Sequence, residues 1–169
     1  RVLAQAALDG CLESFEALVS RYEDRLFRFL LQKTGDHHHA EDLLQVTFVT
    51  AHRKIHLYKA LYPFSTWLYT IAKRLAINHY RRIKPTNPEP VNLATEENPR
   101  SAMMASEQAR SIWDCARRNL TEAQFTVTWL FYGEDMSIRN ISIIMKTSEG
   151  SVKVLLHRAR RKLANEIQL

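Results

Sequence analysis

The sequence has few glycines and cysteines, and it has no long apolar run. The closest pair of its four glycines, Gly133 and Gly150, lies 17 positions apart (133 to 150), which excludes a glycine-rich loop that cradles phosphate. Cys11 and Cys115 lie more than a hundred positions apart (11 to 115) without a Cys-x-x-Cys motif, so neither a zinc finger nor a disulfide framework is indicated, and we expect both to be small buried residues. The longest uncharged stretch, residues 60–72, spans 13 residues and is too short to cross a bilayer.

The overall charge is positive. The chain has 24 Lys and Arg against 18 Asp and Glu, a formal net charge of +6, which favours a polyanionic partner. Apolar residues make up 46% of the sequence, which is typical of a folded protein. Nothing in it has the charged, apolar and small-residue layout of a signal peptide, so we expect a cytoplasmic location.

Proline is concentrated in one acidic segment. Four of the five prolines fall within residues 85–105, among Asn, Glu and Thr, a composition that breaks helices and buries little. A structureless loop of this length is uncommon inside one compact domain. We therefore predict two small domains, residues 1–84 and 106–169, joined by a flexible linker over residues 85–105.

Apolar residues recur at steps of three and four on both sides of this segment, and no strand pattern is present. The fold class predicted is all-α. In the first domain, Thr34-Gly35-Asp36 ends one helix and caps the next, and Pro63 with Ser65 as N-cap opens a third. In the second domain, Thr121-x-x-Gln124 is a capping box, and Ser137 caps a short helix. That short helix, a turn at Lys146-Thr147 and a longer basic helix form a helix-turn-helix pattern.

The last predicted helix carries no acid between Gly150 and Asn165. Its apolar positions face the domain core, so its cations project outward, as in a helix that enters a DNA major groove. A solvated basic face that complements the helix macrodipole is the alternative interpretation. The cations are Lys153, Arg158, Arg160, Arg161 and Lys162.

A second basic cluster follows an aromatic stretch in the first domain. Rings that stack on unpaired bases, beside cations that follow the backbone, are typical of single-strand binding. Alternatively, several of the rings belong to the core, above all Trp67. Tyr58, Tyr62 and Phe64 precede the helix near a proline, and we expect them to be exposed. The cluster comprises Tyr58, Tyr62, Phe64, Trp67, Tyr69, Lys73, Arg74, Arg81, Arg82 and Lys84.

No catalytic or metal-binding arrangement is predicted. His37, His38 and His39 are consecutive, and consecutive helical side chains diverge, which is poor geometry for chelation. For the same reason Glu41 and Asp42 do not form an acid/base dyad. They are suited instead to a basic partner surface.

Together these residues resemble the extracytoplasmic-function (ECF) group of bacterial sigma factors, in the sigma-70 family. The similarity lies in residues 15–18, 25–29, 40–45 with Phe48, and 64–72 for the first domain, and in residues 148–153 and 156–163 for the helix-turn-helix. It covers nearly the whole chain, in the family's order. The sequence departs from the family's usual pattern at several positions. His52 stands where many relatives have Trp, residues 74–78 read Arg-Leu-Ala-Ile-Asn where Asn-Leu-Ala-Ile-Asp is common, and Val154-Leu155 replaces a common Ser-Arg pair. Ser142 and Lys146 stand where Ala and Gly are usual.

The resemblance implies a dissociable specificity subunit of RNA polymerase with no enzymatic activity, cofactor or small-molecule substrate. Its partners would be the clamp helices of the largest polymerase subunit, the beta flap, promoter DNA, and an anti-sigma factor that is often membrane-anchored. The residues that the resemblance implies for binding core polymerase are Glu41, Asp42, Leu44, Gln45 and Phe48. Those it implies for binding the minus-ten element of the promoter are Tyr58, Tyr62, Phe64, Trp67, Lys73, Arg74, Asn78, Arg81 and Arg82. Those it implies for binding the minus-thirty-five element are Ser151, Lys153, Val154, His157, Arg158 and Arg161.

Two other functions remain open at the level of sequence. One is a one-component regulator that binds an operator through its helix-turn-helix, which leaves the aromatic and basic cluster of the first domain unexplained. The other is a metal-binding protein built on the histidines, including His52 and His56, which are four positions apart.

Overall fold

The computed structural model describes residues 2–83 and 107–167, and every regular segment within those ranges is helical. The chain divides into two compact units, residues 1–93 and 94–169. These findings confirm the all-α, two-domain prediction. The predicted linker, residues 85–105, lies outside the described residues. No helix in the described ranges is both long enough and apolar enough to span a membrane.

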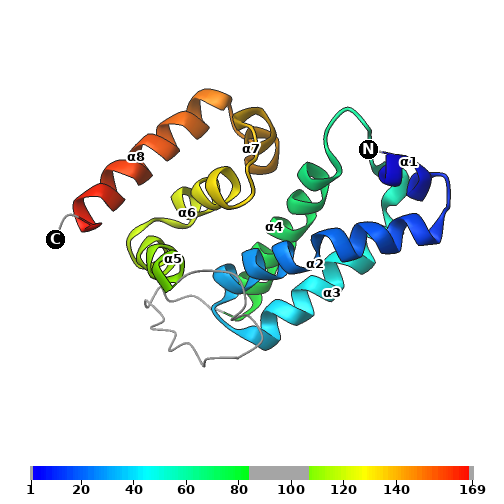
Figure 1. Ribbon diagram of the computed structural model, residues 1–169, viewed down its shortest axis with the longest axis horizontal. Coiled ribbons are helices and arrows are strands. Elements are labelled where there is room, and N and C mark those ends of the chain that lie inside the picture. The colour runs from blue at the N-terminus through cyan, green and yellow to red at the C-terminus, as the bar shows by residue number, and fades with distance from the viewer. Residues whose placement is uncertain (1, 84–106, 168–169) are drawn as a thin grey trace. The chain divides into compact units, whose positions relative to one another are not determined.

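The first unit is built on three long helices. Helices α2 (Leu12–Thr34), α3 (His37–Arg53) and α4 (Phe64–Ile83) pack against one another, as Figure 1 shows. The short α1 (Val2–Leu8) packs on α2 and on the single turn η1 (Ile55–Leu57), which follows α3.

The core of the first unit joins large side chains of α2 and α4 to small ones of α3. Leu26, Phe29 and Leu30 of α2 are completely buried. The buried face of α3 carries Ala40, Leu43, Thr47 and Ala51, mostly small residues that let the neighbouring helices approach closely. The Thr47 hydroxyl donates a hydrogen bond to the Leu43 carbonyl (2.6 Å), which satisfies it inside the core. On α4 the buried residues include Leu68, Tyr69, Ala72 and Ala76.

The predicted helix boundary at Gly35 is confirmed. Gly35 adopts a left-handed conformation (φ 68°) and its N–H donates to the Leu31 carbonyl. The Asp36 carboxylate then caps α3 by accepting from the His39 N–H (2.7 Å). The predicted start of α4 was wrong by two residues: with Ser65 as N-cap the helix would begin at Thr66, but it begins at Phe64, so Ser65 lies inside it. Pro63 precedes the first helical residue, where its missing N–H costs nothing.

The second unit contains α5 (Glu107–Asn119), α6 (Glu122–Thr128), a π-turn η3 (Trp129–Gly133), α7 (Ile138–Met145) and α8 (Glu149–Ile167). The capping box predicted at the start of α6 is present, with the Thr121 hydroxyl accepting from the Gln124 N–H and the Gln124 side chain accepting from the Thr121 N–H. Helix α8 packs on α5, α6 and α7.

An aromatic cluster anchors this unit. The rings of Trp113 and Trp129 lie 4.5 Å apart, and Phe125 lies 6.1 Å from each. The buried Trp129 indole N–H donates to the Glu134 carboxylate (3.3 Å), so the polar end of the ring is satisfied. The remaining core consists of aliphatic residues that include Val127, Leu130, Ile141, Ile144, Val152 and Leu156.

The prediction that both cysteines are buried was wrong. Cys115 is half-buried, and Cys11 is exposed because it lies in the short connection between α1 and α2. The Ser14 hydroxyl donates to the Cys11 sulfur (3.2 Å), and this hydrogen bond lowers the pKa of the thiol.

Candidate nucleic-acid and polymerase-binding surfaces

Helices α7 and α8 form the predicted helix-turn-helix. The Ser137 hydroxyl caps α7 by accepting from the Asn140 N–H (3.2 Å). Lys146 ends α7 in a left-handed conformation (φ 54°, ψ 48°), and the Thr147 N–H donates to the Ser142 carbonyl (3.0 Å). The left-handed conformation explains why the family usually has glycine where this chain has Lys146, since glycine has no Cβ atom to clash with the backbone there. Ser148, directly before α8, accepts from the Ser151 N–H (3.1 Å).

The two faces of α8 differ in burial and charge. Val152, Leu156 and Ala159 are buried at steps of four and three, so one stripe of the helix lies against the unit's core. The opposite face is exposed and basic. It carries every residue expected to contact the minus-thirty-five element, namely Ser151, Lys153, Val154, His157, Arg158 and Arg161.

Arg160 has a different environment from the other exposed cations of α8. Its Nε donates to the Tyr132 hydroxyl (2.6 Å), and its guanidinium lies 5.5 Å from the centre of the Tyr132 ring and 5.7 Å from that of Phe131. These contacts hold Arg160 against η3. It therefore serves packing, whereas Arg158 on the same helix remains available to a ligand.

The aromatic stretch of the first unit forms a compact cluster. The rings of Tyr58, Phe64 and Trp67 lie 5.6 Å apart in all three pairs. The expectation that Tyr58 and Phe64 are exposed was wrong: 4% and 5% of their surfaces are accessible. The Tyr58 hydroxyl donates to the Tyr62 carbonyl (2.8 Å), and the Tyr58 ring packs on that of Phe64, the first residue of α4. Tyr62 and Trp67 are half-buried.

An open pocket of about 630 Å³ lies between the end of α3, η1 and α4 in the same unit. It brings two predicted minus-ten residues, Arg74 and Asn78, together with cations that the sequence analysis did not single out. Arg53 and Lys54 at the end of α3 are these cations; their signal was weak because basic residues are common at any helix C-terminus. The pocket is lined by Thr50, Arg53, Lys54, His56, Leu57, Ile71, Arg74, Leu75 and Asn78.

The other predicted minus-ten residues lie elsewhere on α4. Lys73 is half-buried, Arg81 is exposed, and Arg82 lies in the last turn of the helix.

The exposed face of α3 combines acidic, amide and apolar side chains. Glu41, Asp42 and Gln45, predicted to contact polymerase, are exposed, whereas Leu44 and Phe48 are half-buried. Val46 and Val49, which were not predicted to contact polymerase, are 47% and 58% exposed on the same face. They could have been recognised as apolar residues that fall outside the buried stripe of α3.

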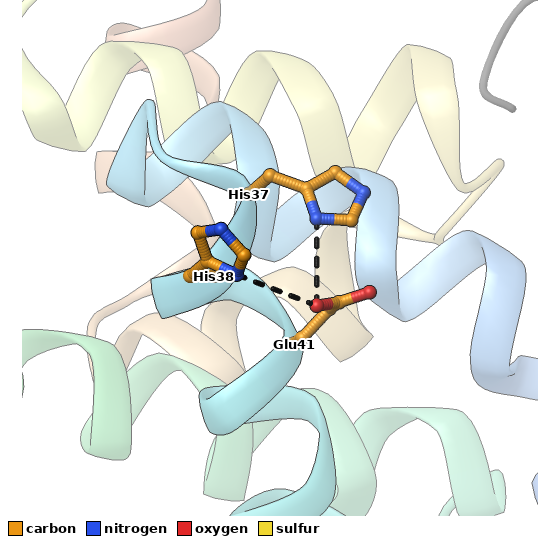
Figure 2. Close-up of side chains that lie close together, drawn as sticks. All are labelled: His37, His38 and Glu41. Carbon is orange, nitrogen blue, oxygen red and sulfur yellow. Dashed lines mark ion pairs between the residues drawn. The ribbon is translucent and has the colours of Figure 1, made fainter. Parts of the chain in front are cut away.

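The three consecutive histidines divide into two environments at the start of α3. His39 diverges as expected: its Nδ1 lies 3.3 Å from the Asp36 carboxylate and its ring contacts that of His79. The other two instead approach one carboxylate, since the Nδ1 atoms of His37 and His38 lie 3.5 and 4.0 Å from Oε2 of Glu41 (Figure 2).

Comparison with known proteins gives two matches to family models. Residues 18–86 match sigma-70 region 2, and residues 112–163 match sigma-70 region 4. The first match contains most of α2 with all of α3 and α4, and the second contains α7 and most of α8.

Curated relatives are similar over most of this chain. The ECF RNA polymerase sigma factor BldN of Streptomyces coelicolor is 30% identical over 168 residues, which cover 96% of this chain and 63% of BldN. The ECF RNA polymerase sigma factor SigW of Bacillus subtilis is 28% identical over 172 residues, covering 94% of this chain and 91% of SigW.

A solved structure has the same fold. The sigma factor RpoE of Bartonella quintana, in its co-crystal structure with the anti-sigma factor NepR, aligns with a TM-score of 0.72 at 17% identity and covers 94% of this chain and 99% of RpoE. The chain belongs to the ECF group of the sigma-70 family, whose members are transcription initiation factors and not enzymes.

Proposed function

We propose that this protein binds core RNA polymerase and directs it to promoters that carry two recognition elements, one read by each unit. The observation that carries the proposal is that each unit presents its own exposed cationic surface. The first unit has the pocket between α3 and α4, and the second has the outer face of α8. A one-component operator-binding regulator needs only the second of these surfaces.

In the second unit, α8 reads the minus-thirty-five element as duplex DNA. Lys153, His157 and Arg158 lie on the exposed face in the first half of the helix, where side chains of a recognition helix reach base edges. The exposed Val154 is suited to a thymine methyl group, and Ser151 and Arg161 to phosphates.

In the first unit, the pocket accepts an unpaired base of the minus-ten element. Arg53, Lys54 and Arg74 supply positive charge for the phosphates, and Asn78 and His56 supply hydrogen-bonding groups. The burial of Tyr58 and Phe64 changes their role from the one expected: they support the half-buried Trp67 and Tyr62 instead of stacking on bases themselves. Lys73 and Arg81 extend the basic surface along α4, and Arg82 in the last turn of that helix is assigned to the same element.

The exposed face of α3 docks on the clamp helices of the largest polymerase subunit. One face of the helix carries two polar residues, Asp42 and Gln45, and two exposed valines, Val46 and Val49. Their spacing of three or four positions places these side chains next to one another on the helix surface. Glu41 adds charge at its edge, and the half-buried Leu44 and Phe48 add apolar area. The second unit contacts the beta flap.

We further propose control by an anti-sigma factor. RpoE of Bartonella quintana was crystallised with NepR, and the fold of the present chain is similar to that of RpoE. A partner that covers the exposed valines of α3 and the basic face of α8 would block polymerase and DNA together. The protein acts in the cytoplasm, and a membrane-anchored anti-sigma factor would hold it at the inner membrane.

In vitro transcription tests the proposed function directly. Purified core polymerase is incubated with fragmented DNA of the source genome, with and without this protein, and transcript starts are mapped. We expect discrete starts that share two upstream elements and are absent with core alone. Failure to bind core, together with stable binding to a palindromic duplex, would favour the operator-binding regulator.

A further inference from the structure

Three potential metal ligands converge at the first turn of α3. The nearest ligand atoms of His37, His38 and Glu41 all lie within 4.8 Å of one another, and Figure 2 shows both imidazoles directed toward the carboxylate. His37 is half-buried, whereas Glu41 is half-exposed and the His38 side chain is 92% exposed. The group is therefore open to solvent on one side.

One of the three ligands, His37, is held in place by its surroundings. The His37 ring packs edge-on against Phe27 of α2, with centroids 5.0 Å apart, and lies one turn before Glu41 on α3. The turn that carries them is fixed by the Asp36 cap. His38 and Glu41, which are both exposed, lose freedom of rotation when all three side chains bind one ion.

We propose that His37, His38 and Glu41 form a binding site for a divalent transition-metal ion of the Zn²⁺ type. Two imidazole nitrogens and one carboxylate oxygen suit Zn²⁺ and its neighbours, whereas Ca²⁺ and Mg²⁺ require mostly oxygen ligands. Bonds of about 2.1 Å in a tetrahedral site place ligand atoms about 3.4 Å apart. The observed separations of 3.5 and 4.0 Å from Glu41 reach that value through small side-chain rotations. Water completes the coordination.

The charges around the site determine its affinity for a metal ion. The positive end of the α3 dipole opposes a cation there, whereas the carboxylates of Glu41 and the nearby Asp36 attract it. With three ligands and an exposed His38, the ion exchanges with solvent instead of being a permanent structural element.

Metal binding at this site affects polymerase docking, an inference that rests on the proposed function. Glu41 is one of the acidic residues proposed to face the clamp helices, and a bound ion takes up its carboxylate. Metal and polymerase then oppose each other, and each lowers the affinity of the protein for the other by the same factor.

Calorimetric titration of the full chain with ZnCl₂ tests the site itself. We expect one Zn²⁺ per chain, with binding weakened about tenfold or more in His38→Ala and in Glu41→Gln. His38 is so exposed that its replacement leaves the fold intact. Two control variants, His39→Gln and His52→Gln, should bind Zn²⁺ like the wild type. Absence of stoichiometric binding, or equal loss in the controls, would overturn the proposal.

A second measurement tests the effect on polymerase. Binding of the chain to core polymerase is measured with and without Zn²⁺, for the wild type and His38→Ala. We expect Zn²⁺ to weaken binding of the wild type only, since the variant controls for any effect of Zn²⁺ on polymerase. Equal behaviour of the two proteins would refute the antagonism. If neither protein binds core in the absence of metal, the proposed function fails, and the calorimetric result still decides the metal site.

Discussion

At the scale of the residue, Lys146 has a left-handed backbone conformation that is unfavourable for any residue with a Cβ atom. A side chain in the left-handed region costs about 1 to 2 kcal/mol because Cβ approaches the backbone, and Lys146 has φ 54°. We expect Lys146→Gly to raise the free energy of unfolding by roughly 0.5 to 1 kcal/mol, after the flexibility of glycine in the unfolded chain is subtracted. Urea unfolding followed by the fluorescence of Trp113 and Trp129 measures the change. The exposed neighbour Thr147, which has no positive φ, is the control: Thr147→Gly should give no increase.

Arg158 and Arg160 are two residues apart on α8 and are expected to behave differently. Arg158→Ala should lower affinity for a promoter duplex by about 1 to 3 kcal/mol and relax specificity at one base pair. Arg160→Ala removes the hydrogen bond to Tyr132 and the contacts with two rings, so its main effect should be on stability. Duplex-binding titrations and thermal unfolding of both variants separate the two effects. Equal losses of sequence discrimination would show that the assignment of Arg160 to packing is wrong.

At the scale of the element, α3 presents two surfaces with different tasks. Its small buried residues bring α2 and α4 close, and its exposed face carries acids and valines that contribute nothing to the core. Val49→Ser should therefore leave the unfolding transition nearly unchanged and weaken binding to core polymerase several-fold, because an apolar contact of about 1 kcal/mol is lost. Pull-down or fluorescence titration with core polymerase measures this. Leu43→Ser, on the buried face, should destabilise the protein instead.

The stability that the Asp36 cap contributes at the start of α3 should depend on pH. The hydrogen bond from the His39 N–H lowers the pKa of the Asp36 carboxyl, so the ionised form is favoured in the folded state. The resulting stability is present above the ordinary carboxyl pKa of about 4 and is lost as the pH falls through the lowered value. In Asp36→Asn the amide oxygen still caps the helix but does not titrate. We expect the stability of the wild type, measured by urea unfolding between pH 6 and 3, to fall more steeply than that of the variant. Parallel curves would contradict this account of the cap.

At the scale of the whole molecule, we propose that α3 of the first unit binds core polymerase and α8 of the second unit binds duplex DNA. A substitution on one of these surfaces should therefore weaken one kind of binding and leave the other unchanged. Asp42→Ala should weaken core polymerase binding, up to about fivefold for one exposed charge, and leave duplex binding unchanged. Arg158→Ala should do the reverse. The full chain is used for both variants, with Glu23→Ala, an exposed acid on α2, as the control for loss of a negative charge. If the two variants failed in the same assay, the assignment of separate surfaces to the two units would be wrong.

The sequence alone was sufficient for the features that depend on short-range chemistry. Periodicity of apolar residues predicted the helices, and the signals at Gly35, Asp36, Thr121 and Ser137 predicted where several of them begin and end. Each of these depends on hydrogen bonds within one turn, which neighbouring residues determine. The family also followed from sequence, because its motifs are continuous segments in a constant order.

Tertiary structure decided what depends on contacts between segments. Tyr58 lies before α4 and Phe64 is its first residue, and both were expected to be exposed. The proline-containing loop between them instead folds so that the two rings are buried against each other. The pocket needs Arg53 and Lys54 from the end of α3 beside Arg74 and Asn78 from α4. Likewise, His37 and His38 approach Glu41 while His39 does not, because Phe27 of α2 holds one ring and Asp36 attracts another. Periodicity tells which side of a helix is buried, but only packing determines which distant side chains meet there.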